Sequence, residues 1–332
     1  INLQADEVIF GRDYEASLSV LHNVQNYENS TTMGRPGMNK KIVNSYLMAD
    51  GSRFTDKAGY ETMTFDQECQ NRDPRLAQTI RTPGYTRIGS TKKEAPNLAY
   101  TMTGYHLIKY SMTANYDEYN KSCNDIPLFR TAEVYLNFAE AKAELGTLKQ
   151  ADINKSIKLL RDRVGMTNLD MELANSKPDP YLMSAATGYP NVKGANQGVI
   201  LEIRRERTIE LAMEGFRYYD IMRWKEGKLF ENDLLGIYVP GPGTYDLDKD
   251  GTDDVCFYVG TKPAGNVPLY LEIGEQIRLS NGESGYIICH SLITKKWNED
   301  RDYLYPVPIS ERTLSNGVIT QNPGWNDGLN FN

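Results

Sequence analysis

The sequence is poor in histidine and cysteine and has no excess of positive charge. Its 332 residues include three histidines and four cysteines, and the formal net charge is −7. No pair of cysteines has metal-ligand spacing, which argues against a zinc site. Phosphate binding requires a basic face, so the negative charge argues against a nucleic-acid partner. Three disulfide pairings are open in an oxidising compartment for Cys69, Cys123, Cys256 and Cys289.

Long hydrophobic runs are also missing. No apolar stretch approaches the roughly 20 residues of a membrane-spanning helix, and the sequence that begins at Ile1 contains no signal-peptide pattern. Its length allows one large domain or two modest ones. Tyrosine, by contrast, is plentiful at 22 residues, and its flat ring with a polar edge suits core packing as well as carbohydrate stacking.

The densest run of charge lies between Glu202 and Trp224. Residues three and four apart share a helix face, so Glu206, Glu210 and Glu214 form an acidic stripe among five arginines. Gly215 ends this helix, and a second short helix follows. The stripe has two interpretations: an acid–base pair for sugar hydrolysis, or a network of arginine–carboxylate pairs that holds helices together.

We favour the structural network. Carboxylates four residues apart point the same way, whereas hydrolysis of a glycosidic bond needs carboxyl groups on its two sides. Nearby arginines would also keep the carboxylates ionised, which is unsuitable for a general acid. The predicted network contains Glu206, Arg207, Glu210, Glu214, Arg217, Asp220 and Arg223.

Helical spacing of apolar residues also predicts a pair of helices, over 134–145 and 153–164, with Asp152 as the cap of the second. Such a pair is typical of a tetratricopeptide unit, which needs neighbouring helices to cover its apolar face. We expect a helical core over about 126–230 and a loop-rich segment over about 231–332. Short strands are expected near 8–10, 76–80 and 105–110, and a short helix over 42–48.

Residues 246–254 carry alternate aspartates followed by glycine, the D-x-D-x-D-G spacing of a calcium loop. Phe257 stands where an EF-hand needs its bidentate glutamate, which excludes an EF-hand. A looser calcium site and a plain Asp-Gly hairpin turn both remain open. The possible ligands are Asp246, Asp248, Asp250, Thr252 and Asp254.

The charged run resembles the signature of SusD/RagB-type outer-membrane nutrient-binding proteins. The matching positions are Glu206-Arg207, Glu210, Glu214-Gly215, Arg217, Asp220 and Arg223-Trp224. Further blocks follow in the family's order: Glu7–Tyr14, Tyr46–Gly51, Arg72–Leu76, Ile126–Ala141, Leu304–Ile309 and Gln321–Trp325. Together they span nearly the whole chain.

This resemblance implies a mainly α fold of tetratricopeptide-like helical repeats with a loop-rich segment and a few short strands. It also implies a non-catalytic protein that binds an oligo- or polysaccharide and passes it to a SusC-like TonB-dependent transporter. Relatives carry a signal, a lipidated cysteine and several helices before the block at Glu7–Tyr14. We therefore expect residues 1–332 to be the C-terminal part of a protein that a lipid anchor holds on the extracellular face of the outer membrane.

Candidate sugar contacts come from two loops. The loop over 167–198 is long, and long loops are often functional. Trp297 lies outside the signature blocks, so we expect it to be the most exposed tryptophan, while Trp325 anchors a tail that wraps back across the helices. The candidate ligand contacts are Tyr181, Tyr189, Asn191, Trp297 and Asn298.

No cofactor is required by this interpretation, apart from a possible structural calcium ion. Two other classes of function remain open. One is a glycoside hydrolase that uses Glu206 or Glu210, and the other is a helical-repeat scaffold that binds only protein.

Overall fold

The computed structural model describes residues 6–326 and residue 328, and the predicted helix-rich chain with a few short strands is confirmed. Its helices are α1 (Val24–Glu28), α2 (Lys40–Ser45), α3 (Phe65–Glu68), α4 (Pro74–Thr79), α5 (Thr131–Glu144), α6 (Gln150–Asn154), α7 (Ile157–Arg163), α8 (Met171–Ser176), α9 (Pro180–Met183), α10 (Gln197–Glu210), α11 (Phe216–Arg223) and α12 (Ile309–Leu314). Short 3₁₀ turns are η1 (Ala16–Leu18), η2 (Phe54–Asp56), η3 (Tyr60–Thr62), η4 (Ala114–Tyr116) and η5 (Gly227–Glu231).

The strands form three small sheets. They are β1 (Val8–Arg12), β2 (Ile126–Arg130), β3 (Leu234–Val239), β4 (Gly243–Tyr245), β5 (Val255–Tyr258), β6 (Leu269–Glu272) and β7 (Gly285–Cys289). β1 pairs with β2 and β3 pairs with β7, both antiparallel. β5 lies between β4, its antiparallel neighbour, and β6, its parallel neighbour.

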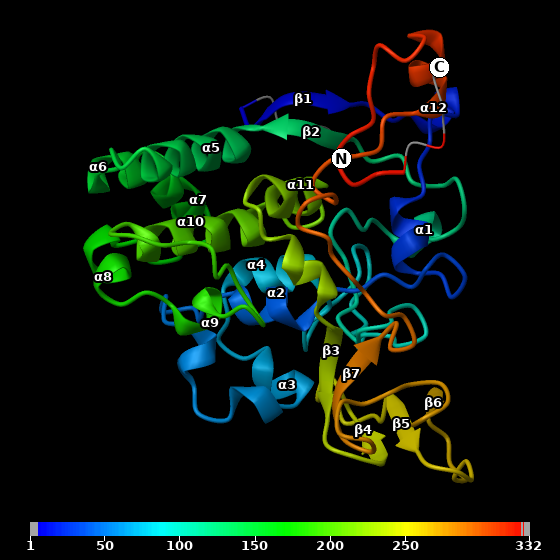
Figure 1. The fold of residues 1–332 in the computed structure, drawn as a ribbon. Helices are drawn as coiled ribbons and strands as arrows, with labels where there is room; N and C mark the ends of the chain where they lie inside the picture. The colour runs from blue at the N-terminus through cyan, green and yellow to red at the C-terminus, as the bar shows by residue number, and fades with distance from the viewer. Residues whose placement is uncertain (1–5, 327, 329–332) are drawn as a thin grey trace.

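Helix α10 runs through the middle of the molecule (Figure 1). Every residue from Gly198 to Glu210 is buried. Ile203 packs with α5 to α9 in one hydrophobic cluster, whereas Ile209 packs in a second cluster with α2, α4 and the strands β3 to β7. Because α10 packs against a hydrophobic cluster on each side, it has no face exposed to solvent, and its charged side chains are buried as well.

Two glycines explain how this helix fits. Gly198 lies so close to α8 that a Cβ would stand 1.8 Å from the carbonyl oxygen of Ala174, so no other residue fits there. α10 ends at Glu210, earlier than the predicted end at Gly215, and Gly215, with φ +85°, instead precedes the first turn of α11.

Of the helical pair, only the first member is confirmed as one helix, and the apolar residues that predicted it, such as Val134 and Phe138, are exposed and not in the core. α5 covers the expected residues, but the second helix is divided into α6 and α7 by a break at Lys155 and Ser156. Asp152 is not the cap of this helix. It lies inside α6, where its carboxylate accepts a hydrogen bond from the N–H of Lys149 at 2.9 Å.

The strands expected over 76–80 and 105–110 are wrong. Residues up to Thr79 belong to α4, because Asp73 accepts from the N–H of Arg75 as an N-cap and Pro74 occupies the first helical position. Only a single bridge joins Ile80 to Leu107.

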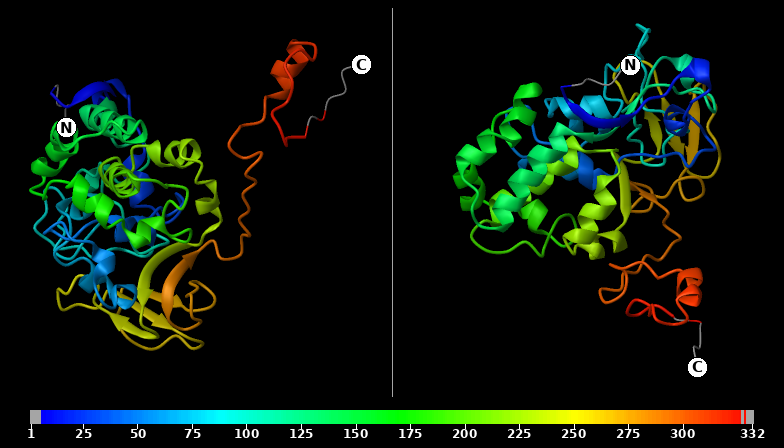
Figure 2. Two further views of the ribbon diagram at one scale, coloured as in Figure 1. Left: turned by 60° about the vertical axis from the view of Figure 1, so that its left-hand side comes forward. Right: turned by 90° about the horizontal axis from the view of Figure 1, so that it is seen from above.

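The end of the chain does not wrap back over the helices. We call residues 304–326 the C-terminal arm, and Figure 2 shows it projecting away from the rest of the molecule. Trp325 packs inside the arm region: its Nε1 donates to the carbonyl of Leu304 at 2.8 Å, and Arg301 lies 4.7 Å from its ring. In the described part of the chain, no helix has the length and apolar character to cross a membrane.

Candidate functional site

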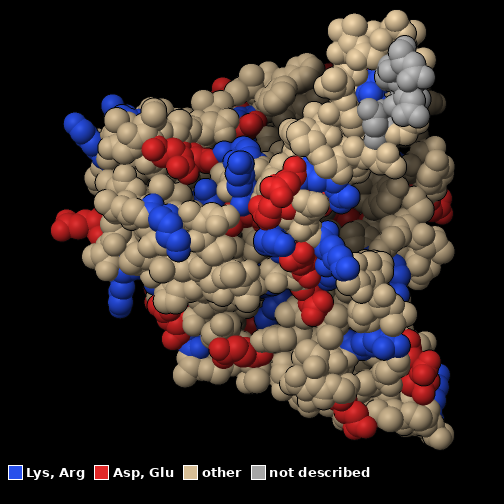
Figure 3. Space-filling view, viewed as in Figure 1, with Lys and Arg blue, Asp and Glu red and all other residues tan. Residues whose placement is uncertain are grey.

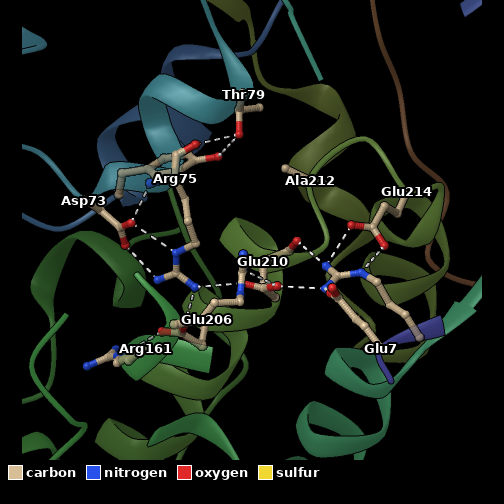
Figure 4. Close-up of polar contacts among 12 residues, drawn as sticks. Glu7, Asp73, Arg75, Thr79, Arg161, Glu206, Glu210, Ala212 and Glu214 are labelled. Carbon is tan, nitrogen blue, oxygen red and sulfur yellow. Dashed lines mark hydrogen bonds and ion pairs between the residues drawn. The ribbon is translucent and has the colours of Figure 1, made fainter. Parts of the chain in front are cut away.

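The acidic stripe of α10 meets basic side chains from several other elements (Figure 4). Glu206 accepts from Arg75 of α4 at 2.5 Å and from Arg161 of α7 at 2.8 Å. Glu210 accepts from the same Arg75 at 3.0 Å and from Arg130 at 2.8 Å. The carboxylates thus connect α4, α7 and the end of β2 through one buried set of charges.

Glu214 continues this set beyond the end of α10. It accepts from Arg130 at 2.7 Å and from Lys109 at 2.6 Å. Glu210 receives a further ion pair from Arg163 at 2.8 Å. Every carboxylate of the stripe therefore has at least two cationic partners.

These cationic partners determine the protonation state of the carboxylates in the stripe. Burial raises the pKa of Glu206, but the charges of Arg75 and Arg161 outweigh it and bring the pKa to about 2. The pKa of Glu210 is lowered in the same way, since Arg130, Arg163 and Arg75 oppose the effect of burial. Carboxylates that stay ionised have no proton to donate to a leaving group at neutral pH.

A second set of pairs holds α11 against α5 and α10. Asp220 accepts from Arg207 at 2.8 Å and from Arg223 at 2.9 Å. Arg223 also pairs with Glu140, which in turn accepts from the indole Nε1 of Trp224 at 2.7 Å. Trp224 is therefore a core residue whose polar edge is satisfied.

Arg217 was predicted to be part of this network, and the structure places it elsewhere. Its Nη1 donates to the hydroxyl of Tyr189 at 2.8 Å and to that of Thr208 at 3.1 Å. No carboxylate among the described residues lies within ion-pair distance of it. The predicted spacing put Arg217 next to acidic residues in sequence, but Gly215 turns the chain and redirects its side chain.

The five predicted ligand contacts are not all exposed, although Asn191 and Trp297 both contact the segment of residues 225–227. Tyr189 is only 3% exposed and packs edge-on against Trp224 at 5.3 Å, and Tyr181 packs against the same core cluster. A buried ring cannot stack on a sugar, which contradicts the prediction for Tyr189, whereas Tyr181 is half-buried and its contact with a sugar stays a prediction. Asn191 is exposed, but its side-chain amide donates to the carbonyl of Lys225 at 2.7 Å.

Trp297 is not the exposed ring that was expected. It is half-buried, and its indole lies so close to Gly227 that a Cβ on this glycine would stand 2.0 Å from Cε2. Asn298 beside it is exposed, and its side chain accepts from the N–H of Asp300 at 3.0 Å. Both residues nevertheless lie at a surface where other aromatic side chains collect.

We call these aromatic side chains the aromatic belt. Neighbouring ring centroids lie 5.0–6.4 Å apart along the belt, within the range of favourable aromatic pairs. It is built from α11, η5 and the segment that leads into the C-terminal arm. Its members are Tyr218, Tyr219, Phe230, Trp297, Tyr303 and Tyr305.

The belt offers both apolar faces and polar edges. Tyr219 and Tyr305 are each 63% exposed, whereas Phe230 and Trp297 lie half-buried behind them. The neighbouring hydroxyl of Tyr305 raises the pKa of Tyr218 to about 12, so its hydroxyl stays protonated and can hydrogen-bond. Flat rings with hydroxyl edges are suited to the faces and hydroxyl groups of sugars, and equally to a protein surface.

Sequence reasoning missed most of this belt. Tyr218 and Tyr219 lie inside the signature run, where they look structural, and Phe230 carries no motif. The available signal was the clustering of Trp297, Tyr303 and Tyr305 within nine positions of an otherwise polar segment. Nothing in the sequence shows that this segment lies against α11.

The aspartate loop connects β4 to β5, so the predicted hairpin is present. Carboxylate oxygens of Asp246, Asp248 and Asp254 lie within 4.8 Å of one another. Asp250 is not in this group of three carboxylates, and its side chain accepts a hydrogen bond from the N–H of Thr252 at 2.8 Å. Burial, followed by the neighbouring aspartates, raises the pKa of Asp254 to about 6.

The fold agrees with comparisons to known proteins. A model of the SusD family matches residues 6–325, so the chain belongs to the SusD family, and the resemblance drawn from its sequence is confirmed. No curated protein matches it.

Two solved structures from Bacteroides fragilis share the fold. One, a SusD-like carbohydrate-binding protein, has 21% identity and a TM-score of 0.59 over 93% of this chain and 53% of its own. The other, a SusD-like protein, has 21% identity and a TM-score of 0.57 over 96% of this chain and 54% of its own. The present chain thus spans about half the length of these relatives.

Proposed function

We propose that this protein binds an oligo- or polysaccharide on its surface and that the aromatic belt is the platform. The observation that carries this proposal is the continuous row of partly exposed rings on a member of the SusD family. Tyr219 and Tyr305 would stack on sugar faces, and Asn298 would hydrogen-bond sugar hydroxyls. Trp297 supports the row from behind.

The proposed role is non-catalytic. The carboxylates that would be needed for hydrolysis, Glu206 and Glu210, are buried and paired with arginines. Their low pKa favours permanent ionisation, which suits neither a general acid nor a proton shuttle. The alternative function is a glycoside hydrolase. An assay for reducing sugar ends would reveal it if the wild type released them and Glu206→Gln abolished the release.

We also propose that the bound glycan passes to a SusC-like TonB-dependent transporter and that the complete protein is held at the outer-membrane surface by a lipid anchor. Membership of the SusD family supports this assignment. The packing of α10 against α5 and α8 supports tetratricopeptide-like helical repeats as the scaffold. A pure scaffold, which binds only the transporter, would have no glycan affinity of its own.

A structural calcium ion at the aspartate loop is a separate proposal. The three converging carboxylates would bind a hard cation through oxygen ligands, which suits Ca²⁺. Adding calcium chloride should then raise the melting temperature of the wild type and leave that of Asp248→Asn unchanged. Equal melting temperatures with calcium and with a chelator would refute a bound ion at this loop.

The test of glycan binding is isothermal titration against plant, host and microbial polysaccharides. Tyr219→Ala and Tyr305→Ala should each weaken binding about fivefold or more, because each removes an aromatic contact worth about 1 kcal/mol. Tyr119→Ala is the matched control, since Tyr119 is 64% exposed and belongs to no ring pair among the described residues. Equal losses in all three variants, or binding that none of them alters, would remove the belt from the proposal.

A further inference from the structure

A cavity of about 330 Å³ lies between the end of α10 and the start of α11. Tyr218 borders both this cavity and the aromatic belt, so the two are contiguous. The volume is within the range of small-molecule sites. Most of the lining is apolar, with side chains that include Met38, Ile42, Leu211, Met213 and Phe216, and its charged side chains are Arg207, Arg217 and Asp220.

Arg217 differs from the other arginines of α10 and α11. The four others, Arg204, Arg205, Arg207 and Arg223, each pair with a carboxylate. Arg217 instead has two neutral hydroxyl partners, both bonded to Nη1. Among the described residues Arg217 has no carboxylate partner, and it lines the cavity.

The charge around the cavity does not balance. Arg207 and Arg217 supply two positive charges to the lining, while Asp220, which pairs with Arg207, supplies one negative charge. One positive charge is therefore left at a half-buried position, next to apolar walls that strengthen its attraction for an anion. The first turn of α11, which also lines the cavity, adds the positive end of a helix dipole.

We propose that this cavity binds the carboxylate of an acidic sugar and that the glycan captured by the protein is therefore anionic, such as one containing uronic or sialic acid. The inference rests on the proposed glycan binding at the belt. The carboxylate accepts hydrogen bonds from Arg217, and the apolar face of the same sugar lies on Phe216. The adjoining sugars continue across Tyr218 onto the belt.

The test compares acidic probes with neutral counterparts on the complete chain. One pair is an oligogalacturonate and its methyl ester, and the other is sialyllactose and lactose. The wild type should bind the acidic member of at least one pair about tenfold or more tightly, as expected for a charged hydrogen bond. The preference should shrink at high salt, because the interaction is electrostatic.

Two variants assign the preference to Arg217. Arg217→Gln should lower the affinity for the acidic member to that for the neutral member, while Arg217→Lys should retain part of the difference. Should Arg217→Gln fail to fold, Met213→Glu supplies the test, since an added carboxylate at the cavity wall should repel the acidic probe alone.

Three results would overturn the inference. They are equal affinity for both members of each pair, a preference that survives Arg217→Gln, and binding of a polyglutamate peptide in place of any acidic glycan. The last result would make the cavity a protein-docking site. Neutral glycans that bind without any acidic preference would refute this inference alone, whereas the absence of all glycan binding would refute the proposed function as well.

Discussion

The helical body and the C-terminal arm differ in how much of their side-chain surface is buried, and among the described residues of the arm only Arg312 is buried. In the body, helices α4, α5, α7, α10 and α11 enclose charged side chains such as Glu206, which is 0% exposed. In the arm, Leu314 and Val318 are more than 80% exposed. On the face drawn in Figure 3, basic and acidic residues alternate over the helices, while the arm at the upper right shows little charge.

The two regions contribute differently to the stability of the protein and to its surface available for binding. Buried charges need partners at short range, since an unpaired charge in the core is far less stable than one in water. The body therefore depends on complementary pairs. Exposed apolar groups contribute little to the stability of a chain but are available for contact with something else. Stability is thus concentrated in the body, and surface available for binding lies in the belt and the arm.

The largest effect is expected from removing one partner of a buried pair. Glu206→Gln should lower the free energy of unfolding by about 3–5 kcal/mol, because Arg75 and Arg161 would keep their charges without a carboxylate between them. Urea unfolding measures this loss. Glu283→Gln is the control, since Glu283 is exposed and has no ion pair among the described residues. Similar stability of the two variants would contradict a body held by paired charges.

Lowering the pH should reveal the same dependence of stability on buried charge pairs. The pKa of Glu206 falls from 4.5 to about 2 on folding, because Arg75 and Arg161 outweigh burial. A lowered pKa gives stability that is complete above the unfolded value and is lost as the pH falls from about 4.5 to 2. The loss from this group should be about 3 kcal/mol. Across this pH range, the free energy of unfolding should therefore fall less steeply with decreasing pH in Glu206→Gln than in the wild type, as urea unfolding at each pH would measure.

Glu28 should give the stability a pH dependence opposite in sign to that from Glu206. It is 1% exposed, and its Oε1 has no hydrogen-bond partner, although Ser111 donates to Oε2 at 2.7 Å. Burial raises its pKa from 4.5 to about 8. The unfolded chain releases this proton first, so stability should fall as the pH rises from about 4.5 to 8. Glu28→Gln should then raise the free energy of unfolding at pH 8, on the order of 2 kcal/mol. A variant less stable than the wild type at that pH would indicate an ionised, paired Glu28.

The smallest effect is expected from the arm. Removing the chain from residue 306 onward should change the free energy of unfolding by less than about 1 kcal/mol, because the apolar side chains in the described part of the arm, such as Leu314 and Val318, are largely exposed already. Leu201→Ala in α10, where the side chain is 0% exposed, should instead cost about 2–5 kcal/mol. A truncated chain as unstable as Leu201→Ala would show that the arm belongs to the folded core.

Sequence patterns were most successful where one local rule acted alone. α5 follows from apolar spacing, and the turn at Gly215 follows from the conformational freedom of glycine. The rules failed where a capping signal competed with β-type residues, as at Asp73 and Pro74 before α4. The division of the second predicted helix at Ser156 has no signal in the apolar spacing, which continues through it.

The residues of the candidate site could likewise be predicted only in part from the sequence. The sequence could suggest aromatic residues for a sugar surface, but it chose Tyr189, which α10 and α11 enclose. The belt joins rings at positions 218–230 and 297–305, and such a separation in sequence has no periodicity to reveal it. Whether a tyrosine packs or is exposed depends on its neighbours in space and not on its own chemistry.

By itself, the sequence determined the family of this protein, its helix-rich character and the presence of many opposite charges in one helical run. These properties follow from residue types and spacings along the chain. Only the tertiary structure decided which charges are paired, because an ion pair such as that of Glu206 with Arg75 joins residues 131 positions apart. It also decided that Arg217 stands apart beside an apolar cavity, since the turn at Gly215 sets the direction of that side chain.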